Sequence, residues 1–304
     1  MKREIVKGKV QQHVSMRPFT SWHIGGEAER LYWPLNLPDL QAFLKTLPPN
    51  EPLTWIGLGS NTLVADSGIS GTTIITQGAL KEMTLTSPTQ IRAEAGLSCA
   101  QVARFAAKNN LVEGEFLAGI PGTIGGALLM NAGAFGGETW EKVIRVETID
   151  RSGTIHTYPA SHFEYAYRHI KGLKDGEWFI AATFEFVPGN GQDSLAKIKA
   201  LLERRAETQP TGEPSCGSVF RNPPGNYAAR LIEQAGLKGY KIGDAQISEK
   251  HANFILNTHN ATAHDTLALV HHIQKTVQAH SGIHLEPEFK CIGFFDTDSM
   301  CKLD

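Results

Sequence analysis

The sequence of 304 residues has few cysteines and no long apolar run. Its four cysteines are scattered without a C-x-x-C pair, which favours reduced thiols over a disulfide framework or a zinc site. No apolar stretch reaches the roughly eighteen residues that a membrane-spanning helix needs. The charged N-terminus lacks the apolar segment of a signal peptide. These absences predict a cytoplasmic protein that does not enter a membrane.

The sequence also lacks an excess of either charge, since 29 lysines and arginines face 31 aspartates and glutamates. This balance argues against a surface that binds nucleic acid. Histidines are present, but His271 and His272 are adjacent and would point about 100° apart on a helix. No acidic residue completes a ligand set near His280 and His284. We therefore expect neither a bound metal nor a nucleic-acid partner.

Three common catalytic or nucleotide-binding motifs are absent. The P-loop pattern does not occur, and residues 57–62 lack the third glycine of the Rossmann fingerprint. Ser218 follows a glycine, but the residues two before and two after it, Cys216 and Phe220, are not the glycines of a nucleophile elbow. A P-loop ATPase is therefore excluded and a Ser-His-Asp hydrolase is disfavoured. Any dinucleotide would lie outside a Rossmann crevice.

Glycine, in contrast, is concentrated in two segments. Seven glycines fall within residues 117–137, a density at which we expect neither a helix nor an ordinary strand. A second glycine-rich turn, residues 57–61, ends an apolar run. Such turns let main-chain N–H groups approach phosphates closely. The pair predicts a site for an extended dinucleotide, and two tight hairpins in a glycine-rich sheet are the structural alternative.

Periodicity and turn residues predict an α+β protein in three parts. Residues 1–77 and 78–190 each mix strands and helices, and residues 191–304 form a third part with a loose tail at 296–304. The predicted helices are 39–47, 98–109 with Ser98 as N-cap, 194–207, 228–235 and 263–280. The predicted strands are 53–58, 72–76, 91–95 and 179–187, with a hairpin over 143–149 and 154–158.

Three further clusters combine polar chemistry with turns. Aromatic residues surround Arg168 in 163–169, Ser218 lies in 215–224, and Glu286 and Glu288 flank a proline. Each cluster has an ordinary structural interpretation as well. An arginine can stack on a surface ring, a Gly-Ser pair is commonly a turn, and two carboxylates on one face of an extended segment are commonly solvated. Taken singly, none of them establishes a site.

Taken in order, these segments resemble the UDP-N-acetylenolpyruvoylglucosamine reductase family. The motifs are GLGSNTLV at 57–64, AGIPGTIGGA at 118–127, NAGAFG at 131–136, Tyr167-Arg168, GSVFRNP at 217–223, KHANF at 250–254 and LEPE at 285–288. The resemblance runs from about residue 20 to 294. Glycine-rich pieces alone recur in other FAD enzymes of the vanillyl-alcohol-oxidase type. The whole ordered set is specific to this family.

The resemblance implies two α/β subdomains that hold FAD and a third, α+β domain that closes over the substrate. It implies that NADPH reduces FAD and that the flavin passes hydride to the enolpyruvyl group of a UDP-sugar. Protonation then gives UDP-N-acetylmuramate for peptidoglycan synthesis. The implied cofactor-binding residues are Gly57, Gly59, Ser60, Asn61, Gly119, Ile120, Pro121, Gly122, Gly125 and Gly126.

The resemblance also implies the catalytic and substrate-binding residues. Arg168 would clamp the enolpyruvyl carboxylate, Ser218 would donate the proton, and Glu288 would donate or share a proton beside the same oxygens. Substrate contacts are expected from Tyr167, Asn222, Lys250 and Asn253. Arg168 is followed by His169 and Ile170, where the family pattern has a small hydroxyl residue nearby. The short connection from Arg168 to Phe179 indicates the type without a tyrosine-bearing lid.

Two other functions stay open at this point. An FAD oxidase of the same fold would use oxygen and another substrate, although the clusters around Ser218 and Glu288 argue against it. A binding module that holds a nucleotide-sugar without turnover would purify without flavin colour. We expect a monomer.

Overall fold

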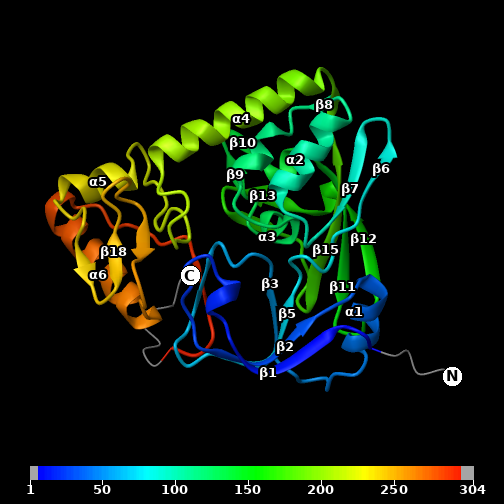
Figure 1. Cartoon of the computed structure of the whole chain (residues 1–304), viewed down its shortest axis with the longest axis horizontal. Coiled ribbons are helices and arrows are strands. Elements are labelled where there is room, and N and C mark those ends of the chain that lie inside the picture. The colour runs from blue at the N-terminus through cyan, green and yellow to red at the C-terminus, as the bar shows by residue number, and fades with distance from the viewer. Residues whose placement is uncertain (1–5, 296–304) are drawn as a thin grey trace. The chain divides into compact units, whose positions relative to one another are not determined.

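The computed structural model describes residues 6–295 and divides them into two compact units (Figure 1). Unit 1 comprises residues 6–11, 31–58 and 72–204, and unit 2 comprises residues 12–30, 59–71 and 205–295. The chain crosses between the units after Leu58 and inside four elements: β1 (Lys9–Ser15), β2 (Glu27–Trp33), β5 (Ile69–Ile75) and α4 (Gly191–Thr208). The predicted boundary at residue 190 lies directly before α4, whereas the crossing between the units lies inside this helix, after Arg204. The predicted tail at 296–304 lies outside the described residues.

Unit 1 is built on a five-stranded antiparallel sheet of order β12-β11-β15-β7-β6. The strands are β6 (Met83–Ser87), β7 (Gln90–Glu94), β11 (Val143–Asp150), β12 (Ile155–Pro159) and β15 (Glu177–Glu185). The structure confirms the predicted hairpin, because β11 and β12 pair around a turn at residues 151–154. The buried strands predicted near 91–95 and 179–187 are also present.

A helix and the glycine-rich segment share one core with this sheet. Helix α2 (Cys99–Lys108) begins as predicted, because the Ser98 and Gln101 side chains form a reciprocal capping box. Its apolar face contributes Val102 and Ala106 to the buried cluster that also contains Leu117 and Phe184. The glycine-rich segment therefore packs into the core and is not a surface loop.

The expectation that no helix forms in the glycine-rich segment was wrong, because residues Ile124–Leu129 form the short helix α3. Its first N–H groups are satisfied from outside, since Ile124 donates to the Leu97 carbonyl and Gly125 to the Ala95 carbonyl, each at 2.9 Å. A Cβ on Gly125 would lie 3.0 Å from the Ala95 Cβ. Close packing thus requires glycine inside this helix and outweighs its poor helix propensity.

The remaining elements of unit 1 are short. Helix α1 (Leu37–Leu44) begins two residues before the predicted start, because the Asn36 side chain caps the Asp39 N–H at 3.0 Å. Strand β3 (Leu53–Ile56) pairs in parallel with β5. The other strands are β8 (Leu111–Val112), β9 (Gly133–Ala134), β10 (Gly137–Glu138), β13 (Glu164–Ala166), β14 (His169–Lys171) and β16 (Val187–Pro188). Three 3₁₀ turns complete the unit, at Glu115–Gly119, Thr139–Glu141 and Ala160–His162.

Unit 2 combines two helices with a three-stranded antiparallel sheet, of order β17-β18-β19. The elements are α5 (Ala228–Gln234), α6 (Ala263–Ser281), β17 (Lys241–Ile242), β18 (Ala245–Ile247) and β19 (Ile255–Asn257). Both helices were predicted, and α6 ends at Gly282 with φ +74°, a left-handed cap that suits glycine. Outside this sheet, β4 (Thr62–Val64) pairs in parallel with β20 (Lys290–Ile292), and Arg17–Phe19 form a 3₁₀ turn.

The cysteines differ from the expectation of four reduced thiols. Cys99 and Cys216 are buried free thiols, but Cys291 is disulfide-bonded. A disulfide depends on the distance between two side chains in space, which the spacing of cysteines along the sequence does not reveal. Within residues 6–295, no helix is long and apolar enough to cross a membrane. No group of three or more His, Cys, Asp or Glu side chains in the same range is arranged to hold a metal ion.

Candidate active site

In unit 2, main-chain hydrogen bonds align the segment that contains Ser218 with the segment that contains Glu288. The Glu288 N–H donates to the Val219 carbonyl at 2.9 Å, and Phe220 forms an antiparallel bridge with Pro287. On its other edge, the Val219 N–H donates to the Asn253 carbonyl at 2.9 Å. The serine is therefore carried on a strip of extended chain that is bonded on both edges.

The side chain of Asn253 strengthens this strip. Its Oδ1 accepts from the Phe220 N–H at 3.0 Å, and its Nδ2 donates to the Phe220 carbonyl at 2.8 Å. Asn253 is only 3% exposed, so both bonds are shielded from water. The sequence suggested Asn253 as a substrate contact. In the structure its amide is engaged by the chain two residues beyond Ser218.

Glu288 lies in the same buried setting, with 5% of its surface exposed, while Ser218 is half-buried. Burial raises the pKa of the Cys216 thiol well above its ordinary value, and the negative charge of Glu288 raises that pKa further. Asn61 reaches this segment from the glycine-rich turn, donating through Nδ2 to the Glu288 carbonyl at 3.0 Å. Asn61 thus links a predicted cofactor turn to the main chain of a residue predicted to be catalytic.

The predicted substrate contacts Asn222 and Lys250 are both exposed, and the side chain of each makes a hydrogen bond within unit 2. Asn222 Oδ1 accepts from the Ala228 N–H at 3.0 Å, which stabilises the start of α5. Lys250 Nζ donates to the Ala206 carbonyl. Neither side chain is buried among other groups, so each keeps donors on the solvent side.

In unit 1, Tyr167 and Arg168 form the two-residue turn of the hairpin β13–β14, in which Ala166 pairs with His169. Arg168 has φ +55°, a left-handed conformation that is uncommon for residues other than glycine. Its guanidinium carbon lies 5.6 Å from the centroid of the Tyr167 ring, which is itself 56% exposed. The turn therefore presents a planar cation and a phenol together.

The glycine-rich segment is closely packed, and several of its N–H groups already have partners. Those of Ile120, Gly122 and Gly125 donate to main-chain carbonyls within unit 1. A Cβ on Gly57 would lie 2.1 Å from Thr123 Oγ1, and one on Gly119 would meet the Phe135 ring. A Cβ on Gly126 would meet no atom closer than 3.9 Å, so open space adjoins this residue.

Thr123 is a candidate that the sequence interpretation missed. Its hydroxyl is buried and makes no hydrogen bond with any residue between 6 and 295, although the side chain is only 2% exposed. A buried hydroxyl without a partner is costly and points to a group that completes it. The sequence does carry a signal for it, because Thr123 directly precedes Ile-Gly-Gly and threonine is a common N-cap residue. The density of glycines around it concealed that signal.

The other half of the predicted cofactor site is the turn at Gly59, Ser60 and Asn61 in unit 2. Gly59 has φ +65°, and a Cβ there would lie 2.2 Å from the Phe19 carbonyl oxygen. Ser60 is half-buried. Unit 1 thus holds Gly57, residues 119–126, Tyr167 and Arg168, while unit 2 holds residues 59–61, Ser218 and Glu288. The convergence of the two sets on one ligand stays a prediction.

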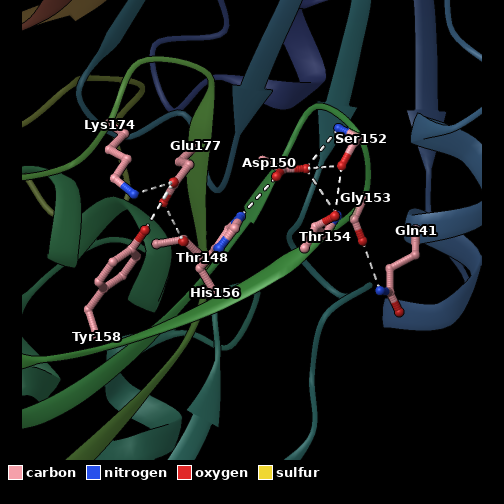
Figure 2. A network of polar contacts seen from close by, with 10 residues as sticks. All are labelled: Gln41, Thr148, Asp150, Ser152, Gly153, Thr154, His156, Tyr158, Lys174 and Glu177. Carbon is pink, nitrogen blue, oxygen red and sulfur yellow. Dashed lines mark hydrogen bonds and ion pairs between the residues drawn. The ribbon is translucent and has the colours of Figure 1, made fainter.

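A separate polar network at the tip of the β11–β12 hairpin contains Asp, Ser and His side chains (Figure 2). Asp150 lies between the other two, bonded to Ser152 Oγ at 2.6 Å and to His156 Nε2 at 2.8 Å. A hydrolase triad instead needs the histidine between the serine and the carboxylate. Gln41 on α1 also bonds the turn, through the Gly153 carbonyl. The network therefore stabilises a hairpin and carries no nucleophile.

Comparison with known proteins gives two domain matches. Residues 209–292 match the C-terminal domain of UDP-N-acetylenolpyruvoylglucosamine reductase, and residues 28–158 match an FAD binding domain. The first region contains Ser218, Asn222, Lys250, Asn253 and Glu288. The second contains Gly57 and the glycine-rich segment.

Relatives that match over most of the chain have the same enzyme name as the C-terminal domain match. The UDP-N-acetylenolpyruvoylglucosamine reductase of Legionella pneumophila (strain Paris) is 59% identical over 276 residues, covering 90% of this chain and 91% of the relative. The enzyme of the same name from Alkalilimnicola ehrlichii is 52% identical over 291 residues, covering 96% and 97%. The crystal structure of that reductase from Thermus caldophilus superposes with a TM-score of 0.81 at 31% identity, covering 94% of this chain and all of the other.

Proposed function

Because this chain belongs to the UDP-N-acetylenolpyruvoylglucosamine reductase family, we propose a role in that reaction for each of its candidate residues. The family membership makes it an FAD-containing, NADPH-dependent oxidoreductase of peptidoglycan synthesis. It reduces the enolpyruvyl group of a UDP-sugar to give UDP-N-acetylmuramate. The observation that carries the residue assignment is the bond from the Glu288 N–H to the Val219 carbonyl, which aligns Glu288 with the serine strip.

The glycine-rich backbone and Thr123 fit the cofactor. FAD, when bound, supplies the substrate with hydride taken from NADPH. We propose that Gly57, Gly59, Ser60, Asn61 and residues 119–126 hold it, with the unpartnered Thr123 hydroxyl as one donor. Gly126 leaves room for a close approach of the cofactor to the main chain, whereas Gly57, Gly59, Gly119 and Gly125 pack against other parts of the chain.

Arg168 is proposed to bind the carboxylate of the enolpyruvyl group. Adding hydride to C3 leaves negative charge spread over C2 and that carboxylate. A planar guanidinium can hold both carboxylate oxygens with two parallel hydrogen bonds, which a lysine cannot do. The exposed Tyr167 ring beside it is proposed to contact the same part of the substrate.

Ser218 is proposed to donate the proton to C2. A serine hydroxyl is a weak acid in water, so its contribution depends on exact placement beside the carbon that receives the proton. The strip bonded on both edges supports such placement. Glu288, buried beside the strip, is proposed to donate or share a proton at the substrate carboxylate.

For the rest of the substrate, we propose Asn222 and Lys250 as contacts to the UDP moiety, since both are exposed polar groups of unit 2. The role that we propose for Asn253 differs from the sequence prediction. Because both ends of its amide bind Phe220, Asn253 is proposed to hold the serine strip in place. We also propose a cytoplasmic monomer without a nucleic-acid partner. The net charge of −2 argues against a surface that binds nucleic acid.

The test is the Ser218→Ala variant in separated half-reactions. Reduction of the bound flavin by NADPH needs no proton at C2, so its rate should stay near that of the parent enzyme. Reoxidation by UDP-N-acetylenolpyruvoylglucosamine without oxygen should fall by roughly 10²–10⁴, the usual worth of a positioned acid. Stopped-flow absorbance of the flavin reports both rates. Equal losses in both steps would remove Ser218 from the role of proton donor.

A further inference from the structure

The hairpin that carries Arg168 has little support of its own. Its strands β13 and β14 pair only with each other, and an isolated two-stranded hairpin is marginally stable at best. All three β13 residues are exposed, and the left-handed backbone of Arg168 adds strain at the turn. Contacts from outside the hairpin must therefore fix the position of the turn.

Aromatic packing fixes the base of the hairpin. Phe163, directly before β13, is 5% exposed, and its ring centroid lies 4.8 Å from that of Trp140. Tyr165 also stacks on Trp140, with a distance of 6.0 Å between the two ring centroids. These contacts involve residues three and five positions before Arg168. They locate the first strand without fixing the peptide at the turn.

The turn itself is held by the side-chain amide of Asn131. Its Nδ2 donates to the Ala166 carbonyl at 3.1 Å and to Glu138 Oε2 at 2.8 Å, while its Oδ1 accepts from the Trp140 N–H at 3.2 Å. Asn131 is 2% exposed; its bond to the Trp140 N–H is buried, and its bonds to Ala166 and Glu138 are part-buried. Both amide hydrogens and the oxygen are used, which leaves the side chain a single orientation.

We propose that Asn131 is a positioning residue that fixes the Arg168 guanidinium through the Ala166 carbonyl; this inference depends on the proposed role of Arg168. The Ala166 carbonyl belongs to the peptide that enters the Tyr167-Arg168 turn. Asn131 lies in the glycine-rich segment, a few residues after α3. Its amide therefore ties the arginine turn to the segment proposed to hold the cofactor, and a displacement of about 1 Å at a reacting group can cost 10²-fold in rate.

Two substitutions distinguish the contribution of the Asn131 side chain from that of its backbone conformation. Asn131 has φ +38°, so Asn131→Gly keeps the left-handed backbone and removes only the amide. Asn131→Asp keeps the shape, loses both donors and places a second carboxylate beside Glu138. In the FAD-loaded enzyme, reoxidation by UDP-N-acetylenolpyruvoylglucosamine should fall roughly tenfold for Asn131→Gly, the worth of about one buried hydrogen bond, and further for Asn131→Asp. Flavin reduction by NADPH should be unchanged in both.

Crossing these variants with Arg168→Gln tests the mechanism of the effect. If Asn131 acts through Arg168, Asn131→Gly should cost tenfold in the parent enzyme and nothing further in Arg168→Gln. Backbone hydrogen exchange in peptides that cover residues 163–171 should also be faster in Asn131→Gly. An equal rate loss in both backgrounds, or unchanged exchange in the hairpin, would overturn the proposal. If Arg168→Gln alone leaves the reoxidation rate unchanged, the proposed role of Arg168 is wrong. That result is distinct from a failure of the proposal for Asn131.

Asn109→Ala is the matched control. Asn109 Nδ2 donates to the Phe105 carbonyl at 2.8 Å at the end of α2, so this variant also loses an amide-to-carbonyl bond in unit 1. It should lower the urea midpoint, by less than Asn131→Gly because Asn109 is only half-buried, and leave both half-reactions unchanged. A loss of substrate reduction in Asn109→Ala as large as that in Asn131→Gly would show that general destabilisation explains the effect, and would overturn the proposal.

Discussion

The two regions that carry the proposed catalytic side chains are supported in opposite ways. The Ser218 strip of unit 2 is bonded on both edges, by the Asn253 carbonyl and the Glu288 N–H, and again through the Asn253 amide. The Arg168 turn of unit 1 closes an exposed hairpin, and the side chain of Asn131 bonds the peptide that enters it. A proton donor needs exact placement beside one carbon, whereas a guanidinium clamps a carboxylate through two equivalent donors.

This contrast has consequences for stability as well as for rate. Bonds in the strip are shielded from water, so losing one leaves a buried polar group unsatisfied, at a cost of about 1–3 kcal/mol. Most of the hairpin is exposed, and its freed groups can bond water instead. Damage to the strip should therefore appear in both folding and catalysis. Damage to the hairpin should appear mainly in catalysis.

The largest expected effect is that of Asn253→Ala. It leaves both the N–H and the carbonyl of Phe220 buried without partners, so we expect a loss of about 2–4 kcal/mol in the free energy of unfolding. Reoxidation by substrate should fall by roughly 10²-fold or more, because the serine loses its placement. Urea denaturation and single-turnover kinetics measure the two losses.

Asn257→Ala is the control for that variant. Asn257 is another buried asparagine of unit 2, whose Nδ2 donates to the Trp22 carbonyl at 3.0 Å and whose Oδ1 accepts from the Ala261 N–H at 2.9 Å. It should lose similar stability and keep its substrate rate. Equal kinetic losses in the two variants would mean that the strip has no special role beyond folding.

Local signals predicted much of this fold, and contacts between distant residues account for what they missed. Ser98 with Gln101 and the Gly282 cap mark helix ends within a few residues, so α2 and α6 could be placed from sequence. The helix α3 could not, because Gly125 is explained by its packing against the Ala95 Cβ, thirty residues away along the chain. No linker in the sequence marks the crossings between the two units, because three of them lie inside strands, one inside α4 and one directly after Leu58.

The candidate site shows the same division. Glu288 and Ser218 could be proposed from the sequence because they lie in segments that resemble family motifs. The structural roles of Asn253 and Asn131 could not be predicted, because an asparagine amide can bind a ligand or the main chain equally well. Which of the two it does depends on whether a carbonyl such as those of Phe220 and Ala166 lies within reach in the folded chain. The spacing of residues along the sequence does not give the distance between such a carbonyl and the asparagine amide.

The smallest expected effect concerns a hairpin that has many bonds and no catalytic residue, β11–β12 (Figure 2). Burial acts to raise the pKa of Asp150, but hydrogen bonds from Ser152, His156 and main-chain N–H groups outweigh it and lower the pKa to about 2. Because the pKa is lowered in the folded protein, ionised Asp150 stabilises the fold at pH values above its ordinary pKa of 3.8. This stabilisation is lost as the pH falls through about 2.

Asp150→Asn should therefore lower the free energy of unfolding at pH 7 by only about 1 kcal/mol, since the site is partly solvated. The difference from the parent enzyme should shrink at pH 3, and both half-reactions should be unaffected. Urea midpoints at the two pH values test the sign. A difference that grows at pH 3 would mean that Asp150 does not stabilise the fold as its ionised form.

The most direct test of the account is whether Arg168 and Glu288, one from each unit, act on the same enolpyruvyl group. Arg168→Lys, Glu288→Gln and the double variant should each be reduced by NADPH at the parent rate and then mixed with UDP-N-acetylenolpyruvoylglucosamine without oxygen. Because both residues stabilise one developing charge, the double variant should lose less than the product of the two single losses. Losses in the reoxidation rate that multiply fully would show that the two residues act independently, and would contradict the account.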